Sequence, residues 1–275
     1  MNEPTRHSLG KRLLAAALST LAPGVGHYLL GRTRVGLALV GALLAFFVGT
    51  ALTATGDSPW LFWAFAGCAI AVQLALIVHP LTLRRGTSPQ FWRMVAVGAV
   101  VLLSSGVLRR AVREFVVESF RTPSGSMLPG FPSGSMFFVS KLNRSPGPGD
   151  VIAYRLPDTP DLFMKRVIAM PGQTIGAQGE SVILNRQPLR QERVARACTF
   201  TASCQIWTES LAGQSYEIAR SSPDALGPIE ETRVPRDSVY VLGDHRDDSR
   251  DSRHHGPVPF TDVVGTVSFI WWPGK

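Results

Sequence analysis

Two long apolar runs without a charged residue constrain this chain more than any other feature of its sequence. The first covers residues 35–55 and the second covers residues 60–78. Each is close to the ~20 residues that an α-helix needs to cross the hydrocarbon core of a bilayer. A tight turn at 56–59 separates them, and aromatic residues open the second run, as at a membrane interface. We therefore expect two membrane-spanning helices joined by a short turn.

Apolar segments on either side of these runs extend the membrane region. Residues 94–108 are short for a span and need the flanking aromatic residues to complete one. Residues 13–30 are interrupted by Pro-Gly-Val-Gly-His at 23–27, which favours a helical hairpin or re-entrant segment. A cleaved signal peptide is the alternative for this stretch, although no clear small-x-small cleavage site follows it. We expect residues 1–110 to form a membrane anchor with about three transmembrane helices plus the N-terminal hairpin.

The net charge of +8 is confined to this anchor. Residues 1–115 contain 11 Lys and Arg against 3 Asp and Glu, whereas residues 116–275 contain 17 of each. Basic residues that flank apolar runs follow the positive-inside bias of membrane proteins. A nucleic-acid-binding protein would need its basic excess on a folded domain. We therefore expect a lipid bilayer, and no nucleic acid, as a partner.

The same bias predicts the orientation of the chain. Placing the arginine-bearing loops on the cytoplasmic side leaves residues 111–275 outside, although the arginines just after the third run oppose this mildly. Cys198 and Cys204 support it, because they bracket a short polar stretch with no His or Cys neighbours at metal spacing. We expect these cysteines to form a disulfide, which indicates an oxidising compartment.

The pattern of residues 111–275 favours a mainly β domain, partly closed into a barrel. Short runs of alternating apolar residues are separated by Pro, Gly, Asn and Asp, as is typical of strands, and no long amphipathic helix appears. Residues 109–120 are a candidate interfacial helix, and residues 191–236 are expected to be an irregular insertion. The candidate strands are 136–142, 150–156, 162–169, 181–184, 215–219, 238–242 and 263–271.

A pentapeptide with two hydroxyls, Pro-Ser-Gly-Ser-Met at 123–127, follows the apolar region. A serine is a poor nucleophile unless a general base activates it. Three histidines lie in or beside the membrane region and three in the charged loop after residue 244, where a Ser-His-Asp triad is conceivable. An α/β-hydrolase would need Gly-x-Ser-x-Gly. Met-Leu-Pro follows Ser126 instead, so that class does not fit.

Lysine is the other candidate base. The chain has only four lysines, and Lys165 lies in the apolar strand candidate at 162–169. Burial of its amine would lower the pKa toward neutrality, and a Ser-Lys pair is a known variant of the catalytic triad. Alternatively, Lys165 is an ordinary strand residue whose ammonium reaches water.

Four segments carry a combined signal: residues 123–129 (PSGSMLP), 149–154 (GDVIAY), 165–172 (KRVIAMPG) and 243–253 (GDHRDDSRDSR). Together they resemble the type I signal peptidases. They occur in that family's order and at compatible spacing, and a membrane anchor precedes them, as in the family. Each segment alone is a weak signal, but the set is highly specific.

The resemblance implies a role for each matching residue. Ser126 would be the nucleophile, Lys165 the general base, and Ser124 would join the Ser126 amide in the oxyanion hole. Ser249 would orient the lysine amine, and Asp251 and Arg253 would form a supporting ion pair. Asp244 is placed with these supporting residues, Cys198 and Cys204 resemble a loop disulfide found in some members, and the substrate pockets would be lined by Pro123, Phe131 and Met164.

A second Pro-Ser-Gly-Ser-Met at 132–136 makes Ser135 an alternative nucleophile. Family spacing disfavours it, because Gly134 and Ser135 fall where members have Gly-Asp at the start of a strand that often ends in a lysine, here Lys141. Other departures are His245 and Asp248 in place of the usual asparagines. We expect His245 to be a solvated loop residue; its titration is a further hypothesis.

The resulting hypothesis is a membrane-bound, monomeric serine endopeptidase that needs no metal or organic cofactor. It would remove signal peptides from preproteins after small-x-small sites on the outer face of a bacterial inner membrane. The alternative is a catalytically silent or narrow-specificity protein of the same fold that binds exported segments. A transport bundle is disfavoured because the spans contain no charged residue, and soluble Ser-Lys repressor proteases do not need three membrane runs.

Overall fold

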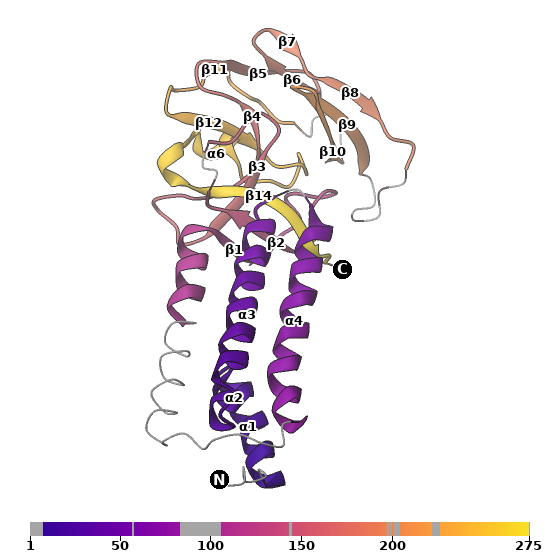
Figure 1. Ribbon diagram of the computed structural model, residues 1–275. Helices are drawn as coiled ribbons and strands as arrows, with labels where there is room; N and C mark the ends of the chain where they lie inside the picture. Colours follow the sequence, from indigo (N-terminus) through magenta and orange to yellow (C-terminus); the bar gives the residue numbers. More distant parts are fainter. Residues whose placement is uncertain are drawn as a thin grey trace, which may run out of the picture. The chain divides into compact units, whose positions relative to one another are not determined.

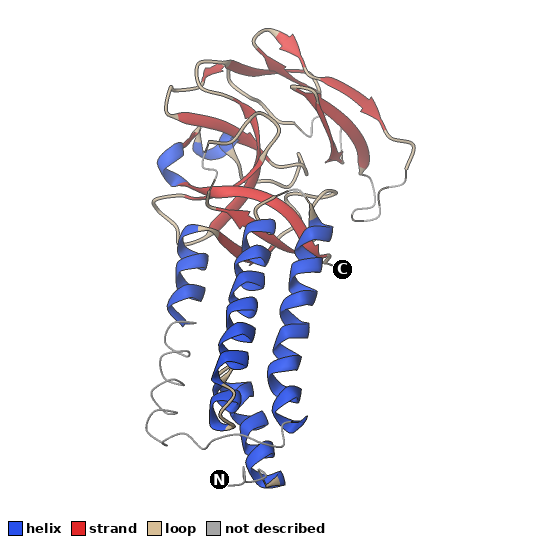
Figure 2. Cartoon of the chain, viewed as in Figure 1, coloured by secondary structure: helices blue, strands red, loops and turns tan. Residues whose placement is uncertain are grey.

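The chain divides into two compact units, Met1–Val116 and Val117–Lys275. The structure is a computed structural model, and the first unit is helical while the second consists mainly of strands (Figure 1, Figure 2). The residues it describes are 8–56, 58–82, 106–142, 145–196, 198, 200, 204–221 and 226–274.

Among the described residues of the helical unit, two helices are long and apolar enough to cross a membrane. They are α3 (Thr33–Thr53) and α4 (Pro59–Thr82), with mean hydropathies of 2.4 and 2.3. The expected third span, 94–108, falls almost entirely outside the described residues. Residues 106–115 are helical, so the interfacial helix expected at 109–120 ends early, where the chain turns into a strand. The number of spans stays a prediction.

The N-terminal apolar segment folds into two short helices, α1 (Leu9–Leu21) and α2 (Val25–Leu29). Gly24 has a φ of 85°, a left-handed conformation that favours glycine. Gly26 lets the helices touch, because a Cβ there would lie 2.0 Å from the Ala15 carbonyl oxygen. The hairpin expected around 23–27 therefore has a steric basis in its glycines.

Within the described residues, the strand-rich unit forms three sheets, whose strands are red in Figure 2. A seven-stranded sheet has the order β1-β2-β14-β3-β4-β12-β13, a four-stranded sheet the order β11-β5-β6-β7, and a three-stranded sheet the order β10-β9-β8. The large sheet consists of β1 (Val117–Arg121), β2 (Met136–Ser140), β3 (Val151–Arg155), β4 (Leu162–Ala169), β12 (Ser238–Leu242), β13 (Val258–Pro259) and β14 (Val263–Trp272). The smaller sheets consist of β5 (Thr174–Gln178), β6 (Ser181–Leu184), β7 (Gln187–Pro188), β8 (Arg190–Arg193), β9 (Gln205–Leu211), β10 (Gln214–Arg220) and β11 (Thr232–Arg233).

Apolar helices followed by a mainly β domain confirm the expected fold class. The sheets do not close into a barrel within the described residues, since the large sheet runs from β1 to β13. Its core lies along β3, β4 and β12, which carry almost uninterrupted buried residues. Strands buried on both faces read as continuous apolar runs, which places the candidate lysine of β4 inside the domain.

The expectation of an irregular insertion at 191–236 is wrong. Strands β9 and β10 form an antiparallel hairpin and pair with β8. Ala212 and Gly213 both have positive φ, at 50° and 81°, which is the geometry of a tight two-residue hairpin turn. The segment therefore carries a regular sheet, whose inward-facing polar residues obscure the strand pattern.

Candidate active site

Ser126 lies on a turn that is anchored in the core. The Leu128 N–H donates to the Gly125 carbonyl at 3.0 Å, and the Phe131 N–H donates to the Met127 carbonyl at 2.9 Å. The Met127 side chain is fully buried, in a cluster with Phe137. Burying the residue directly after the serine fixes the turn, so the hydroxyl is presented from a rigid support.

Lys165 reaches this serine from the middle of β4. Its amine donates to the Ser126 Oγ at 2.7 Å, and the residue is only 4% exposed. Burial lowers the pKa of Lys165 from its ordinary value of 10.5 to about 8, although Asp251 and Asp244 partly oppose the shift. A nucleophile and a base within hydrogen-bond distance are the geometry that serine activation needs. The solvated alternative for this lysine does not agree with its burial.

Ser124 contacts the hydrogen-bonded pair of Ser126 and Lys165, called the dyad below. Its hydroxyl donates to the Ser126 Oγ at 3.2 Å. In the described part of the chain, the Ser126 N–H has no hydrogen-bond acceptor. A free amide and a nearby hydroxyl are the donors expected of an oxyanion hole, so this role of Ser124 stays a prediction with a suitable geometry.

Arg166, the residue after the lysine, ties β4 to the loop that follows β12. Its Nε donates to Asp244 Oδ1 at 2.8 Å and its Nη2 to Oδ2 at 2.6 Å, while Nη1 donates to the Gly149 carbonyl. Both side chains are buried. A bidentate guanidinium–carboxylate pair fixes orientation as well as distance, so the pair holds the loop against the strand that carries Lys165.

The loop at 243–253 has an internal ion pair between Asp251 and Arg253. The Asp251 carboxylate accepts two bonds from Arg253, both at 2.8 Å, and one from the Gly243 N–H at 2.9 Å. Burial alone would raise the pKa of Asp251, but these hydrogen bonds and the Arg253 charge bring it below its usual value. Asp251 also caps the short helix α6 (Ser252–His255). The expected supporting residues therefore fix the conformation of this loop.

Gly243 lets the loop approach the serine. A Cβ at this position would lie 2.1 Å from Ser249 Oγ and 2.6 Å from the Ser126 carbonyl oxygen. The Ser249 hydroxyl is buried and does not hydrogen-bond the lysine amine in the described part of the chain. Its orienting role thus stays a prediction, supported by proximity to the turn.

The second pentapeptide has a different environment. The Ser135 hydroxyl is fully buried and accepts a hydrogen bond from the Gly274 N–H at 2.8 Å. Lys141, at the end of the following strand, pairs with Glu118 at 2.8 Å. The side chains of Ser135 and Lys141 are therefore engaged in contacts between segments of the β domain. Lys165 lies at hydrogen-bond distance from the serine of the first pentapeptide, Ser126.

The histidines of the charged loop do not build a triad. His245 is 3% exposed, so the expectation of a solvated residue is wrong; its ring lies edge-on to Phe200, with centroids 6.1 Å apart. His254 belongs to the capping box of α6, and the His255 ring hydrogen-bonds the Tyr154 hydroxyl at 3.0 Å. His245 is held inside the domain because its backbone N–H donates to the Ser126 carbonyl at 3.1 Å.

A cavity of about 550 Å³ opens beside the dyad. Pro123 and Met164 line it together with Ser126 and Lys165, and their role in binding substrate stays a prediction. Phe131 is not among its lining residues and packs edge-on against Phe137, with ring centroids 6.3 Å apart. Four charged residues also line the cavity. Asp248 and Arg250 belong to the segment 243–253, whereas no motif contains Arg121 and Asp161.

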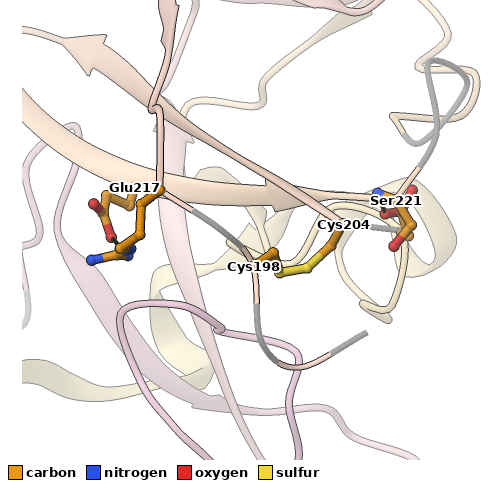
Figure 3. The surroundings of a disulfide bond; sticks show 6 residues. Cys198, Cys204, Glu217 and Ser221 are labelled. Carbon is orange, nitrogen blue, oxygen red and sulfur yellow. Dashed lines mark hydrogen bonds and ion pairs between the residues drawn. A yellow bond between two sulfur atoms is a disulfide. The ribbon is translucent and has the colours of Figure 1, made fainter. Parts of the chain in front are cut away.

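Cys198 and Cys204 form a disulfide, with Cα atoms 5.6 Å apart (Figure 3). Arg196 and Glu217 pair nearby at 2.7 Å. Among the described residues, no group of three or more His, Cys, Asp or Glu side chains could hold a metal ion. The two cysteines thus brace the segment that leads into β9, as the spacing suggested.

In this chain a serine hydroxyl is bonded to a buried lysine amine, on a β domain that follows apolar helices in the sequence. This is the arrangement of a membrane-associated serine peptidase. The family model "Signal peptidase, peptidase S26" matches residues 92–272. The chain therefore belongs to the signal peptidase family S26.

Individual relatives agree with this family. The chain is 30% identical over 201 residues to "Signal peptidase I" of Leptolyngbya laminosa, covering 69% of this chain and 83% of that protein. It is 29% identical over 198 residues to "Probable signal peptidase I-1" of a Synechocystis strain, covering 68% and 87%. A crystal structure of a signal peptidase I from Enterococcus faecalis is 25% identical, covering 44% of this chain and 96% of that one, with a TM-score of 0.30.

Proposed function

We propose that this chain is a membrane-bound serine endopeptidase that removes signal peptides from exported preproteins by a Ser-Lys mechanism. The observation that carries the proposal is the 2.7 Å hydrogen bond between the buried Lys165 amine and the Ser126 hydroxyl. Membership of the S26 family supports the same reaction. The substrates would be preproteins with small residues at the first and third positions before the cut.

The lowered lysine pKa supports Lys165 as the general base. With a pKa of about 8, about one-tenth of the amine is neutral at pH 7, compared with about one in 3,000 at the ordinary value of 10.5. The neutral amine takes the Ser126 proton while Oγ attacks the scissile carbonyl carbon. The resulting ammonium then protonates the leaving amine as the peptide bond breaks.

In deacylation water is the nucleophile, and Lys165 again acts as the general base. The ester joins the signal peptide's new C-terminal carbonyl to Ser126, and the Lys165 amine, neutral again, activates the water that hydrolyses it. The Ser124 hydroxyl and the Ser126 N–H would donate to the oxyanion in both halves. Among the described residues, the Ser126 N–H has no acceptor and the Ser124 hydroxyl donates to Ser126 Oγ. No step needs a metal or an organic cofactor.

The cavity suggests how a substrate binds. It is bordered by residues 120–124, at the end of β1 and just beyond it, and by residues 161–165, at the start of β4. An extended segment between two strand edges can add to them by main-chain hydrogen bonds. The apolar side chains of Phe137 and Met164 on its lining would accept small residues beside Ser126. The charged residues of the same lining would contact polar parts of the substrate.

The apolar helices support action at a membrane. With α3, α4 and the predicted third run at 94–108 crossing a bacterial inner membrane and the basic loops inside, the β domain would lie on the outer or periplasmic face, where a disulfide is stable. Exported preproteins meet this face while their signal peptides are still in the bilayer. We propose that the chain acts there as a monomer, in contact with lipid.

The test is cleavage of a preprotein with an Ala-x-Ala site by the detergent-solubilised full chain. Mass spectrometry of the products should place the cut directly after the second Ala. A matched preprotein with Leu in place of that Ala should remain intact. Binding of the first preprotein without any cut, while a control peptidase cleaves it, would contradict the proposal and favour a silent binding protein of the same fold.

A further inference from the structure

The three-stranded sheet β10-β9-β8 contacts the loop beside the dyad through the main chain. The Ala219 N–H, near the end of β10, donates to the Asp244 carbonyl at 2.9 Å, and the Arg246 N–H donates to the Ala219 carbonyl at 3.0 Å. The residue between them, His245, donates its N–H to the Ser126 carbonyl at 3.1 Å. One segment, 244–246, is therefore bonded to the sheet on one side and to the serine on the other.

A buried ion pair reinforces this connection. Arg246 and Glu209, which lies on β9, are both 0% exposed at their side chains. Arg246 Nη1 donates to Glu209 Oε2 at 3.0 Å, its Nη2 donates to Oε1, and its Nε donates to the Gly243 carbonyl at 3.2 Å. The guanidinium thus holds the loop's own backbone while it is fixed by a carboxylate of the sheet.

Glu209 is built into the sheet by further donors. Its carboxylate accepts from the Tyr216 hydroxyl at 2.7 Å and from the Gln191 amide at 2.5 Å. Burial alone would raise the pKa of Glu209, but Arg246 and these hydrogen bonds outweigh it and keep the pKa low. The Arg166 guanidinium lies over the Tyr216 ring, 4.0 Å from its centroid. Arg166 in turn pairs with Asp244, so two ion pairs join at this tyrosine.

Stability alone gives no reason for such an arrangement. Two charges taken out of water lose hydration, and a buried ion pair is often no more stabilising than apolar side chains of similar size. A bidentate pair does fix distance and angle between the groups that it joins. Here those groups are a sheet outside the cavity and the segment that bonds the nucleophile's carbonyl.

We propose that Glu209 is a positioning residue of the peptidase. Through Arg246 it holds segment 244–246, and with it the Ser126 turn, in the geometry that the dyad needs. The sheet β10-β9-β8 is then part of the active-site scaffold, although it does not line the cavity. This inference rests on the proposed function.

The first test compares Glu209→Gln with the full-length parent in the preprotein cleavage assay. The variant keeps size and loses charge. Its kcat should fall about 100-fold with KM within twofold, since a displacement of about 1 Å can cost that much and Glu209 does not touch the cavity. Glu192→Gln is the matched control, because Glu192 lies on β8 of the same sheet and is exposed. It should leave both constants within twofold.

A destabilised control separates positioning from folding. Val182→Ala shortens a buried side chain on β6, outside this sheet, and should lower Tm without changing kcat, provided that kcat is measured well below Tm and normalised to the folded fraction. The double variant Glu209→Gln/Arg246→Gln should be no slower than Arg246→Gln alone, because Glu209 acts through Arg246. Independent losses that multiply in the double variant would overturn the inference.

A second readout does not depend on cleavage. Hydrogen exchange of the His245 and Arg246 amides should be at least tenfold faster in Glu209→Gln than in Glu192→Gln, since these amides bond Ser126 and Ala219. Unchanged exchange, or faster exchange with full kcat, would overturn the inference. A parent chain that cleaves nothing would refute the proposed function, and unchanged exchange in that case would refute the coupling as well.

Discussion

Replacing Lys165 by Met should stabilise the protein while abolishing cleavage. The lysine side chain is buried at 4% exposure, and burial lowers its pKa from 10.5 to about 8. At ~1.4 kcal/mol for each pH unit, this difference corresponds to about 3 kcal/mol of unfolding free energy that the charged amine costs below pH 8. Methionine has a similar length and no charge, so Lys165→Met should recover stability of this order.

The gain has a defined pH dependence. Between pH 8 and 10.5 the unfolded chain binds a proton that the folded amine has lost, so the parent becomes more stable relative to the variant as pH rises. The difference between Lys165→Met and the parent should be largest at pH 7 and close to zero above pH 10.5. At about 2–4 °C per kcal/mol, the expected increase in Tm at pH 7 is about 6–12 °C.

The assay is thermal unfolding of the detergent-solubilised full chain at pH 7 and at pH 10.5. Lys141→Met is the matched control, because it removes a lysine that forms an ion pair with Glu118. This control should gain nothing. Equal Tm changes for the two variants, or a Lys165→Met gain that does not shrink with pH, would refute the reasoning that burial of this amine is unfavourable when it is charged.

Three further predictions concern the dyad and its surroundings. The kcat/KM for preprotein cleavage should rise about tenfold per pH unit up to about pH 8 and then level off, because the neutral Lys165 amine is the reactive form; a value that falls over this range would contradict the assignment. Gly243→Ala should reduce cleavage at least about 100-fold, since its Cβ would lie 2.1 Å from Ser249 Oγ, whereas Gly147→Ala, with 3.6 Å of space, should leave the rate within twofold. Ser135→Ala should lower the unfolding free energy by about 1–2 kcal/mol through loss of the Gly274 hydrogen bond, seen as a lower Tm, and should leave kcat unchanged.

Several strands of the β domain could be predicted from the sequence. The strands expected at 162–169, 181–184 and 238–242 are found with those bounds. They are short apolar runs between turn residues, so local pattern and burial agree. Strand β1 was missed because its residues continue a helical pattern, and β5 because its small and polar residues give no apolar alternation.

Residues outside the motifs could not be placed from the sequence. Glu209 interrupts the apolar pattern of β9, and its burial depends on Arg246, which lies 37 residues further along the chain. The same holds for His245, which is buried because its backbone bonds the Ser126 turn. Such positions depend on contacts between distant segments, which local patterns do not encode. The apolar strand around Lys165 makes it a candidate base, and the resemblance of its motif and the Ser126 motif to a known family favours their approach.

The most direct test of the central claim compares three variants of the full chain on one Ala-x-Ala preprotein. Ser126→Ala and Lys165→Ala should each abolish cleavage, whereas Ser135→Ala should cleave at the parent rate in its folded fraction. The reason is that the Lys165 amine lies 2.7 Å from Ser126 Oγ, while the Ser135 hydroxyl bonds the Gly274 amide. Cleavage that survives Ser126→Ala and is lost in Ser135→Ala would contradict the account.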